Sequence, residues 1–530
     1  MKVRIPARSY FDRTHTWSGS MDMGYLVPVC CDEIYPGDTF RDRTETLVRF
    51  EAMIKPMMHE FNVTLHWFFV RDWTIMDDFE DMIYAGVDGE STATVPFNSS
   101  QVTITQGSLG DCLNINPGVY AKDYFSMLPF RAYNKIYNDW YRNMYTEPDE
   151  VSLDSMVMQK RCWERDMFTS GTPYAQRGPA VALPLGSTAP IVGEATVKTN
   201  NPLLPTAISV VRQSDNVNIF TNVGMAASGE SGPLNGTPNG PSAQKGDNTN
   251  LYADLATPGC YVNLQTATAA SVQSLWLAEQ LQKWQMKNMV GGVRYVEGTK
   301  MHFGINTPDA RVERAEYLGG GKSPVVISEV LQTSESTNNG TPQGNLAGHG
   351  ISANLTNGFK RTFSEHGFIM CIMSVMPRTM YAQGIDPMFF RQSHLDFMTP
   401  EFARLGYRPV PMKWLYTGAY LKEGNVVDPS TAGAVWTPTI DPDATFNYQA
   451  IYNELRYKPS TIHGNFRGNE SYWTEARIFA STPSFNDSFV KCTPSKRGFA
   501  VPSEPGLKVQ VLHHLEAFRE LPKEGTPWSL

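Results

Sequence analysis

The sequence predicts a mainly β protein with one antiparallel core, long loop insertions and a few α-helices. Three observations lead to this fold class. Glycine (42 residues) and proline (36 residues) are abundant in the 530-residue chain, as expected where many turns connect short strands. Charged residues make up only 18% of the chain, below the roughly 25% of average proteins. Strand-like segments are scattered along the whole sequence and are separated by long excursions.

Composition also limits the classes of protein to consider. Hydrophobic residues make up 41% and aromatic residues 12% of the chain, enough for a large folded core. The net charge of −8 argues against a surface that is basic throughout, although a local basic patch remains compatible with it. No apolar run approaches the roughly 18 residues of a membrane span, and the first residues lack the apolar stretch of a secretory signal.

The chain begins with a predicted basic arm, residues 1–20, in which a single acid, Asp12, accompanies four positive charges. These charges are the candidate nucleic-acid-binding residues Lys2, Arg4, Arg8 and Arg13. They could neutralise phosphates, while nearby aromatic side chains could stack on the bases of a single strand. An equally good interpretation is an arm that pairs with acids on a neighbouring subunit.

Several segments have the pattern of β-strands. Apolar and polar residues alternate from Thr44 to Ile54, and Leu65–Trp73 is too aromatic for a surface loop. The other strand candidates are Pro324–Val330, Phe368–Met376 and Leu507–Leu515. Phe368–Met376 is continuously apolar, which predicts a strand that is buried on both faces.

Two segments have helical periodicity. In Leu128–Tyr145, the apolar residues Tyr133, Ile136 and Trp140 share one face, and Arg131, Lys135 and Arg142 occupy the rest. The second helix is expected over residues 266–289 and ends before Gly291-Gly292. Its predicted apolar stripe consists of Leu277, Leu281 and Trp284.

Three long polar segments are predicted to be loops. The largest lies within an insertion at residues 187–261, where 17 of the 25 residues between Ala226 and Asn250 are Gly, Pro, Asn, Ser or Thr. Such a stretch cannot bury a core of its own, and a loop of this length in a compact domain is usually functional. The other two are residues 334–358 and 422–448.

No catalytic residue, metal ligand or cofactor site is predicted. The GGGKS sequence at Gly319–Ser323 lacks the first glycine of a phosphate loop, because that position is Glu316, and a tight glycine turn entering a strand explains it better. His513 and His514 are neighbours on a strand and therefore face opposite ways. Asp441 and Asp443 are too few to hold calcium and are interpreted as turn residues.

Seven cysteines are present, an odd number without a CxxC motif. We expect them to be reduced and mostly buried thiols, as in a protein made in a bacterial cytoplasm.

Long motifs distributed over nearly the whole chain carry a family resemblance. They include LPFRAYNKIYNDWYRNMY (Leu128–Tyr145), FTSGTPYAQRGPAVALPLG (Phe168–Gly186) and HFGINTPDARVERAEYLGGGKSPVVISEVLQTS (His302–Ser334). The opening FDRTHTWSGSMDMGYLVPVCCDEIYPGDTF and the closing YKPSTIHGNFR, SFNDSFVKCTPSKRGFAV and RELPKEGTPWSL belong to the same set. In these motifs the chain resembles the major capsid proteins of the microviruses, in particular the gokushovirus branch, small phages that package circular single-stranded DNA.

The resemblance implies a fold, a function and partners. The fold would be an eight-stranded antiparallel jelly roll over residues 21–530, following the arm. Copies of the chain would assemble, in the bacterial host cytoplasm, into a T = 1 icosahedral shell around the single-stranded DNA genome. Expected partners are a small basic DNA-packaging protein, a scaffolding protein, a DNA pilot protein and a host surface receptor. By its place in the family, the 187–261 insertion would form a surface protrusion near the three-fold axis and take part in host attachment.

A different class of function remains open at this point. A glycan-binding or glycan-cleaving phage protein built on a jelly roll would also be aromatic, turn-rich and mildly acidic. The cleaving form requires two carboxylates in one cleft, and distant acids could converge in the fold. Sedimentation separates these classes, because only a shell protein forms a large, uniform, closed particle.

Overall fold

The computed structural model describes residues 8–86, 88–181, 191–192, 195–199, 208–210, 251–254, 261–262, 272–331, 346–356, 358–417, 421–422, 425–426 and 441–523. The chain divides into two compact units. One unit consists of residues 1–177 and 287–530, and the other consists of residues 178–286. Both units contain β-sheet.

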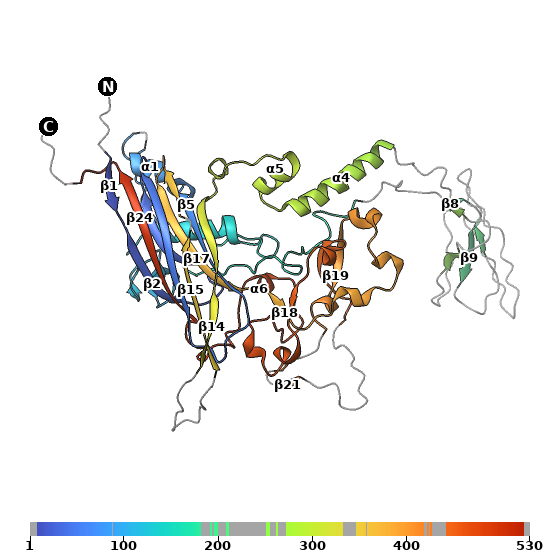
Figure 1. The fold of residues 1–530 in the computed structure, drawn as a ribbon. Helices are drawn as coiled ribbons and strands as arrows, with labels where there is room; N and C mark the ends of the chain where they lie inside the picture. Colours follow the sequence, from blue (N-terminus) through green and yellow to red (C-terminus); the bar gives the residue numbers. More distant parts are fainter. Residues whose placement is uncertain are drawn as a thin grey trace, which may run out of the picture. The chain divides into compact units, whose positions relative to one another are not determined.

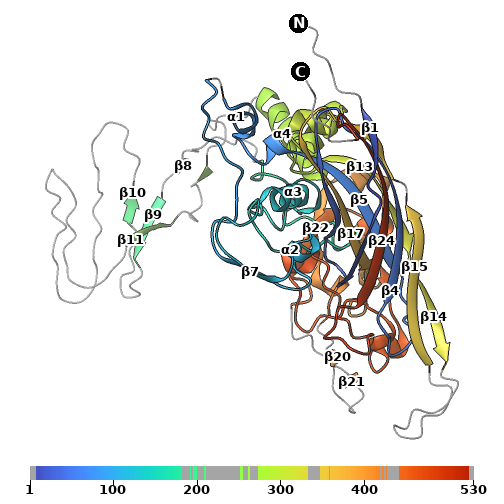
Figure 2. The same ribbon diagram turned by 90° about the vertical axis from the view of Figure 1, so that its left-hand side faces the viewer.

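Two antiparallel β-sheets dominate the larger unit (Figure 1; Figure 2). The seven-stranded sheet runs through β1 (Ser9–Asp12), β24 (Leu507–Arg519), β4 (Thr39–Phe50), β15 (Leu346–Thr356) and β14 (Val326–Leu331), with β2 (His15–Met21) also paired to β24 and β16 (Lys360–Thr362) paired to β4. The four-stranded sheet has the order β13 (Glu316–Pro324), β5 (Phe61–Arg71), β17 (Gly367–Pro377) and β3 (Val27–Ile34).

The pairing of these strands is nested along the chain. β2 pairs with β24, β3 with β17, β4 with β15 and β5 with β13, each time antiparallel. Numbered one to eight in chain order, these strands give one sheet of order 1-8-3-6 and another of order 2-7-4-5. The predicted mainly β, antiparallel fold class is confirmed, and the nested pairing is the one expected of an eight-stranded jelly roll.

The main core lies between the two sheets. Along β24 the buried side chains Leu507, Val509, Val511 and Leu515 alternate with more exposed neighbours, as the two-residue period of a strand requires. They belong to one cluster with inward-facing side chains of β5, of which Trp67 is among the largest. Each such side chain contributes about 1.5–3 kcal/mol when it is fully buried.

β17 is buried over its whole length, which confirms the interpretation of its continuous apolar sequence. It lies between β3 and β5 in the middle of its sheet. Its residues Ile369 and Met373 face the core between the sheets, whereas Met370 and Ile372 belong to a second cluster on the outer face. This second cluster includes the side chains of helix α3 (Leu128–Ile136), which therefore covers the outer face of the four-stranded sheet.

Helix α3 confirms the predicted amphipathic helix and continues into a π-helical turn, η2 (Tyr137–Tyr141). Pro129 lies in its first turn, where the backbone amide groups have no hydrogen-bond acceptor within the helix, so the amide hydrogen that proline lacks is not needed. The fully buried Tyr133 donates a hydrogen bond from its hydroxyl to the Leu26 carbonyl oxygen (2.8 Å) and accepts one from the Gln159 amide (2.9 Å). One side chain thus connects the helix to two other segments of the chain.

Apart from the 20-residue helix α4 (Val272–Gly291), the remaining elements are short. The other helices are α1 (Phe79–Tyr84), α2 (Leu109–Cys112), α5 (Tyr295–Phe303) and α6 (Asp487–Val490). The paired strands outside the two main sheets are β6 (Val102–Ile104) with β7 (Gly118–Tyr120), β18 (Met380–Tyr381) with β23 (Ser460–Thr461), β19 (Tyr407–Pro411) with β22 (Thr445–Ala450), and β20 (Leu421–Lys422) with β21 (Asn425–Val426). Short 3₁₀ turns are η1 (Asp72–Thr74), η4 (Asp309–Val312), η5 (Pro387–Phe390), η6 (His394–Asp396), η7 (Pro400–Arg404), η8 (Met412–Trp414), η9 (Asn453–Leu455), η10 (Gly464–Arg467) and η11 (Ser471–Trp473).

The smaller unit contains two small antiparallel sheets. One has the order β10 (Ile208–Val210), β9 (Ala195–Thr199) and β11 (Leu251–Asp254), and the other pairs β8 (Ile191–Val192) with β12 (Tyr261–Val262). The predicted insertion, residues 187–261, falls entirely inside this unit. The glycine-rich stretch between Ala226 and Asn250 lies outside the described residues.

Four sequence interpretations differ from the structure. Within the predicted arm, residues 1–20, the segments 9–12 and 15–20 belong to β1 and β2, which both pair with β24. The predicted loop 334–358 contains β15, because β4 and β14 supply hydrogen-bonding partners on both sides. The GGGKS sequence is not a turn but part of β13. Gly320 lies so close to the Leu65 carbonyl oxygen of β5 that any larger residue would clash with it. The predicted stripe of Leu277, Leu281 and Trp284 on α4 is exposed rather than buried.

Within the described part of the chain, no helix combines the length and apolar character needed to cross a bilayer.

Replacing Tyr133 with phenylalanine tests the anchoring of α3. Tyr133→Phe should lower the free energy of unfolding by about 1–3 kcal/mol, because the Leu26 carbonyl and the Gln159 amide would each lose a buried partner. Denaturant unfolding of the purified subunit measures this difference. Tyr124→Phe, at a side chain that is 65% exposed, is the matched control and should change stability by less than about 0.5 kcal/mol. Equal stability of both variants would contradict the anchoring role.

Candidate functional site

A concave region of the larger unit adjoins the end of the α3–η2 helix. It is a cavity of about 840 Å³. Its lining includes His66, Trp140, Tyr141, Arg161, Cys162 and Arg294. Aromatic and arginine side chains that converge on a cavity are typical of a binding site for a planar polar ligand or for a peptide. Whether these side chains are available to a ligand depends on the contacts that each one makes within the subunit.

The basic residues of the helix are engaged within the subunit. Arg131 makes a bidentate ion pair with Asp154, with N–O distances of 2.6 and 3.0 Å. Lys135 lies 3.6 Å from Asp139, one helical turn later. The buried Arg142 donates to the Pro148 carbonyl oxygen (2.6 Å) and to Glu150 (2.9 Å). Arg131 and Arg142 therefore hold neighbouring loops of the same chain, whereas Lys135 pairs within the helix itself.

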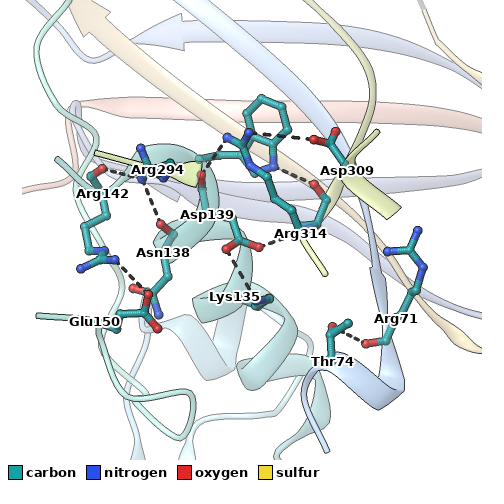
Figure 3. Close-up of polar contacts among 12 residues, drawn as sticks. Arg71, Thr74, Lys135, Asn138, Asp139, Arg142, Glu150, Arg294, Asp309 and Arg314 are labelled. Carbon is teal, nitrogen blue, oxygen red and sulfur yellow. Dashed lines mark hydrogen bonds and ion pairs between the residues drawn. The ribbon is translucent and has the colours of Figure 1, made fainter. Parts of the chain in front are cut away.

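Asp139 and Trp140 connect η2 to the segment before β13. Figure 3 shows Asp139 beside Lys135 and Arg314. The Asp139 carboxylate accepts a hydrogen bond from the Ala315 amide (2.9 Å), and the indole N–H of Trp140 donates to the Ala315 carbonyl oxygen (2.8 Å). The Arg314 guanidinium stacks over the Trp140 ring at 3.7 Å from its centroid. Burial raises the pKa of Asp139, and the neighbouring Lys135 acts in the opposite direction.

Arg294 completes the end of the helix. Its guanidinium donates to the carbonyl oxygens of Asn138 (3.1 Å) and Arg142 (2.9 Å), groups that have no partner within a terminating helix (Figure 3). Glu297 lies 3.6 Å from the same guanidinium. Arg294 is therefore a structural cap for η2. Its capping role explains why a cationic side chain lines the cavity.

The cavity does not contain an activated nucleophile among the residues that the structure describes. Cys162 and His66 both line it. Burial raises the pKa of the Cys162 thiol to about 11 and lowers the pKa of His66 to about 4, so both groups are neutral at pH 7. A catalytic cysteine requires the opposite arrangement, a thiolate beside a charged partner. His66 instead shares a hydrogen bond of 2.7 Å with the Tyr141 hydroxyl.

The predicted nucleic-acid-binding residues are only partly described. Lys2 and Arg4 lie outside the described residues. Arg8 lies 3.4 Å from Glu520, and Arg13 lies 2.8 Å from Asp32, so both form ion pairs within the chain. The structure does not bring these two arginines into the cavity. Their role in binding the genome stays a prediction.

The other candidate sites have structural explanations. Glu316, at the position where a phosphate loop requires glycine, forms ion pairs with Arg71 and Arg361. Asp441 accepts a hydrogen bond from the Asp443 amide (3.0 Å), and Asp443 pairs with Lys413, which agrees with the interpretation of Asp441 and Asp443 as turn residues.

The two neighbouring histidines do face opposite sides of β24. His513 is fully buried, whereas His514 is only half-buried and lies 3.2 Å from Glu45. Burial and the nearby His15 lower the pKa of His513 to about 3, and the backbone of Val29 acts weakly in the opposite direction. His513 is therefore neutral at pH 7. Its proximity to His15 is a feature that sequence spacing could not reveal, because nearly the whole chain separates the two residues.

Comparison with known proteins gives a consistent result. The family model described as "Capsid protein (F protein)" matches residues 2–528. Capsid protein VP1 of Chlamydia phage 1 is 31% identical, with 98% of this chain and 95% of the relative covered. Capsid protein VP1 of Bdellovibrio phage phiMH2K is also 31% identical, over 94% of this chain and 91% of the relative. Capsid protein VP1 of Spiroplasma virus 4 is 27% identical, over 99% of this chain and 94% of the relative. The chain therefore belongs to the F capsid protein family of the microviruses.

Proposed function

We propose that identical copies of this major capsid protein assemble into a closed T = 1 icosahedral shell around a circular single-stranded DNA genome. The observation that carries the proposal is the family match from end to end of a chain whose core is a double-layered β-sandwich. In a sandwich the two sheets bury each other, so the connecting loops are left to contact neighbouring copies. The function is interface burial rather than bond chemistry.

Assembly of the purified protein tests this proposal. Sedimentation and electron microscopy should show one uniform class of closed particles. A protein that stays monomeric under all assembly conditions, with or without the viral partner proteins, would contradict it. The alternative of a glycan-binding or glycan-cleaving phage protein is not supported, because the relatives named above are all capsid proteins.

A surface for copy-to-copy contact stands out between β18 and β19. We name residues 385–405 the apolar segment, because it exposes six large hydrophobic side chains. They are Ile385 (39%), Met388 (56%), Phe389 (71%), Phe397 (55%), Met398 (52%) and Leu405 (63%). We infer that this concentration of exposed apolar side chains in one stretch of chain marks a protein contact, and in a shell the partner is another copy of the chain.

The insertion and the partner proteins complete the proposal. The 187–261 insertion would form an outward protrusion near the three-fold axis and take part in host attachment. The genome would be held by weak, sequence-independent contacts, to which Lys2, Arg4, Arg8 and Arg13 contribute. Because the chain carries a net charge of −8, a small basic packaging protein would supply most of the positive charge. Assembly in the host cytoplasm with scaffolding and DNA pilot proteins belongs to the same proposal.

A polar substitution in the apolar segment should block assembly without unfolding the subunit. Phe389→Ser removes an exposed ring whose burial at an interface is worth about 1.5–3 kcal/mol, so the concentration needed for assembly should rise at least about tenfold. Light scattering measures the assembly threshold, and circular dichroism checks the fold. Val157→Ser, at an aliphatic side chain that is 65% exposed outside the segment, should assemble normally. The reverse pattern would show that the apolar segment is not a contact surface.

Deleting Ser228 to Asn248 should leave the core folded, because the removed stretch contains few residues that could pack in a core. We expect soluble subunits with an unchanged unfolding transition and a defect confined to host attachment or shell stability. Limited proteolysis, thermal unfolding and cell-binding assays measure these properties. Loss of all folded, soluble subunit would show that the stretch is part of the core.

A further inference from the structure

Three potential metal ligands meet at one edge of the sandwich. His15 on β2, Cys30 on β3 and His513 on β24 place one ligand atom each within 4.8 Å of one another. β2 and β24 belong to the seven-stranded sheet, whereas β3 is the edge strand of the four-stranded sheet. The cluster therefore spans the two layers of the fold.

The two histidines are fixed by strand register. His15 and His513 are direct partners in the antiparallel pair of β2 and β24, so their side chains lie on the same face, with ring centroids 5.2 Å apart. The Nδ1 atom of His15 lies 2.9 Å from the Arg13 carbonyl oxygen. A carbonyl oxygen can only accept, so Nδ1 carries the proton and Nε2 keeps a free lone pair. This is the usual second contact of a metal-binding histidine.

His513 is a buried polar group whose hydrogen bonding is incomplete. Its side chain is fully buried, and the backbone of Val29 lies close enough to act on the ring, but neither ring nitrogen makes a hydrogen bond of standard geometry in the part of the chain that the structure describes. Its Nδ1 lies 3.8 Å from Oδ1 of Asp42, a buried oxygen that also lacks a hydrogen bond, while Oδ2 of Asp42 accepts one from Thr44 (2.6 Å). The backbone of Val29 can engage only one of the two ring nitrogens, so the other nitrogen is available to a further partner.

We propose that His15, Cys30 and His513 bind one zinc ion, with water as the fourth ligand. Two imidazole nitrogens and one thiolate form a ligand set that zinc prefers, whereas magnesium and calcium require mostly oxygen ligands. Binding through Nε2 of His513 leaves its Nδ1–H to donate to Asp42, a carboxylate–histidine–metal arrangement. The Cys30 thiol loses its proton to solvent when the zinc–sulfur bond forms, and no group changes oxidation state. His15 is exposed, so the ion and its water have access from solvent.

The zinc ion would tie the first strand of the sandwich to the opposite sheet. β2 and β3 belong to different sheets and share no backbone ladder. The ion pair between Arg13 and Asp32 (2.8 Å) already connects the same two parts of the chain. Because zinc would bind the folded subunit and not the unfolded chain, it should raise the melting temperature of the subunit.

The test uses the full-length subunit and zinc alone. After equilibration with zinc and removal of the unbound ion, elemental analysis should find one zinc per chain. Cobalt substitution should give a thiolate-to-cobalt charge-transfer band. Cys30→Ser and His15→Ala should each weaken zinc binding at least about 100-fold, since loss of a direct ligand costs more than loss of an outer partner. His15→Ala changes an exposed residue and decides the test even if Cys30→Ser fails to fold.

The adjacent residues of the same types provide matched controls. His514 faces the opposite side of β24, towards Glu45, and Cys31 packs against the outer cluster of the four-stranded sheet. His514→Ala and Cys31→Ser should keep the zinc, the cobalt band and the drop in melting temperature on chelation. Folded wild-type subunit without zinc would overturn the proposal. Zinc retained equally by Cys30→Ser and His15→Ala, or lost from either control, would overturn it as well.

Discussion

The burial of β5 and β17 on both faces is the constraint on which the rest of the structure depends. Their inward residues meet the seven-stranded sheet, and their outward residues, such as Phe68 and Met370, require a second apolar cover. Helix α3 provides that cover with Phe130, Tyr133 and Ile136. The aromatic, arginine-rich motif from Leu128 is therefore explained by the sheet that it covers. A sheet of this kind without its helix would expose a continuous apolar face to water.

Covering the sheet determines what the charged residues of the helix do. A helix packed on one side must place its cations near the surface of the same unit, where acids and carbonyl groups of the following loops can meet them. Arg131 and Arg142 find such partners, Lys135 pairs with Asp139 within the helix, and Arg294 caps the carbonyl groups at the end of the π turn. The arginines of this region are consequently explained by their contacts with loops of the same chain. Their presence does not by itself indicate that the genome binds here.

Much of the fold was predictable because strand periodicity and burial agree. The continuous apolar run at Phe368–Met376 and the alternation in Leu507–Leu515 both correspond to strands. β15 was missed because its sequence is polar and glycine-rich, and only its neighbours β4 and β14 make it a strand. The cluster of His15, Cys30 and His513 was also beyond reach, since it depends on register between the two ends of the chain and on contact between two sheets.

Electrostatics then limits how this subunit holds a genome. A net charge of −8 repels phosphate at long range, and Arg8 and Arg13 are already offset by Glu520 and Asp32. An arginine in such a pair can contact phosphate only by sharing or exchanging its partner, which reduces the gain from counterion release. The capsid wall is consequently suited to enclosing DNA rather than to condensing it. The proposed basic packaging protein would therefore supply most of the charge neutralisation.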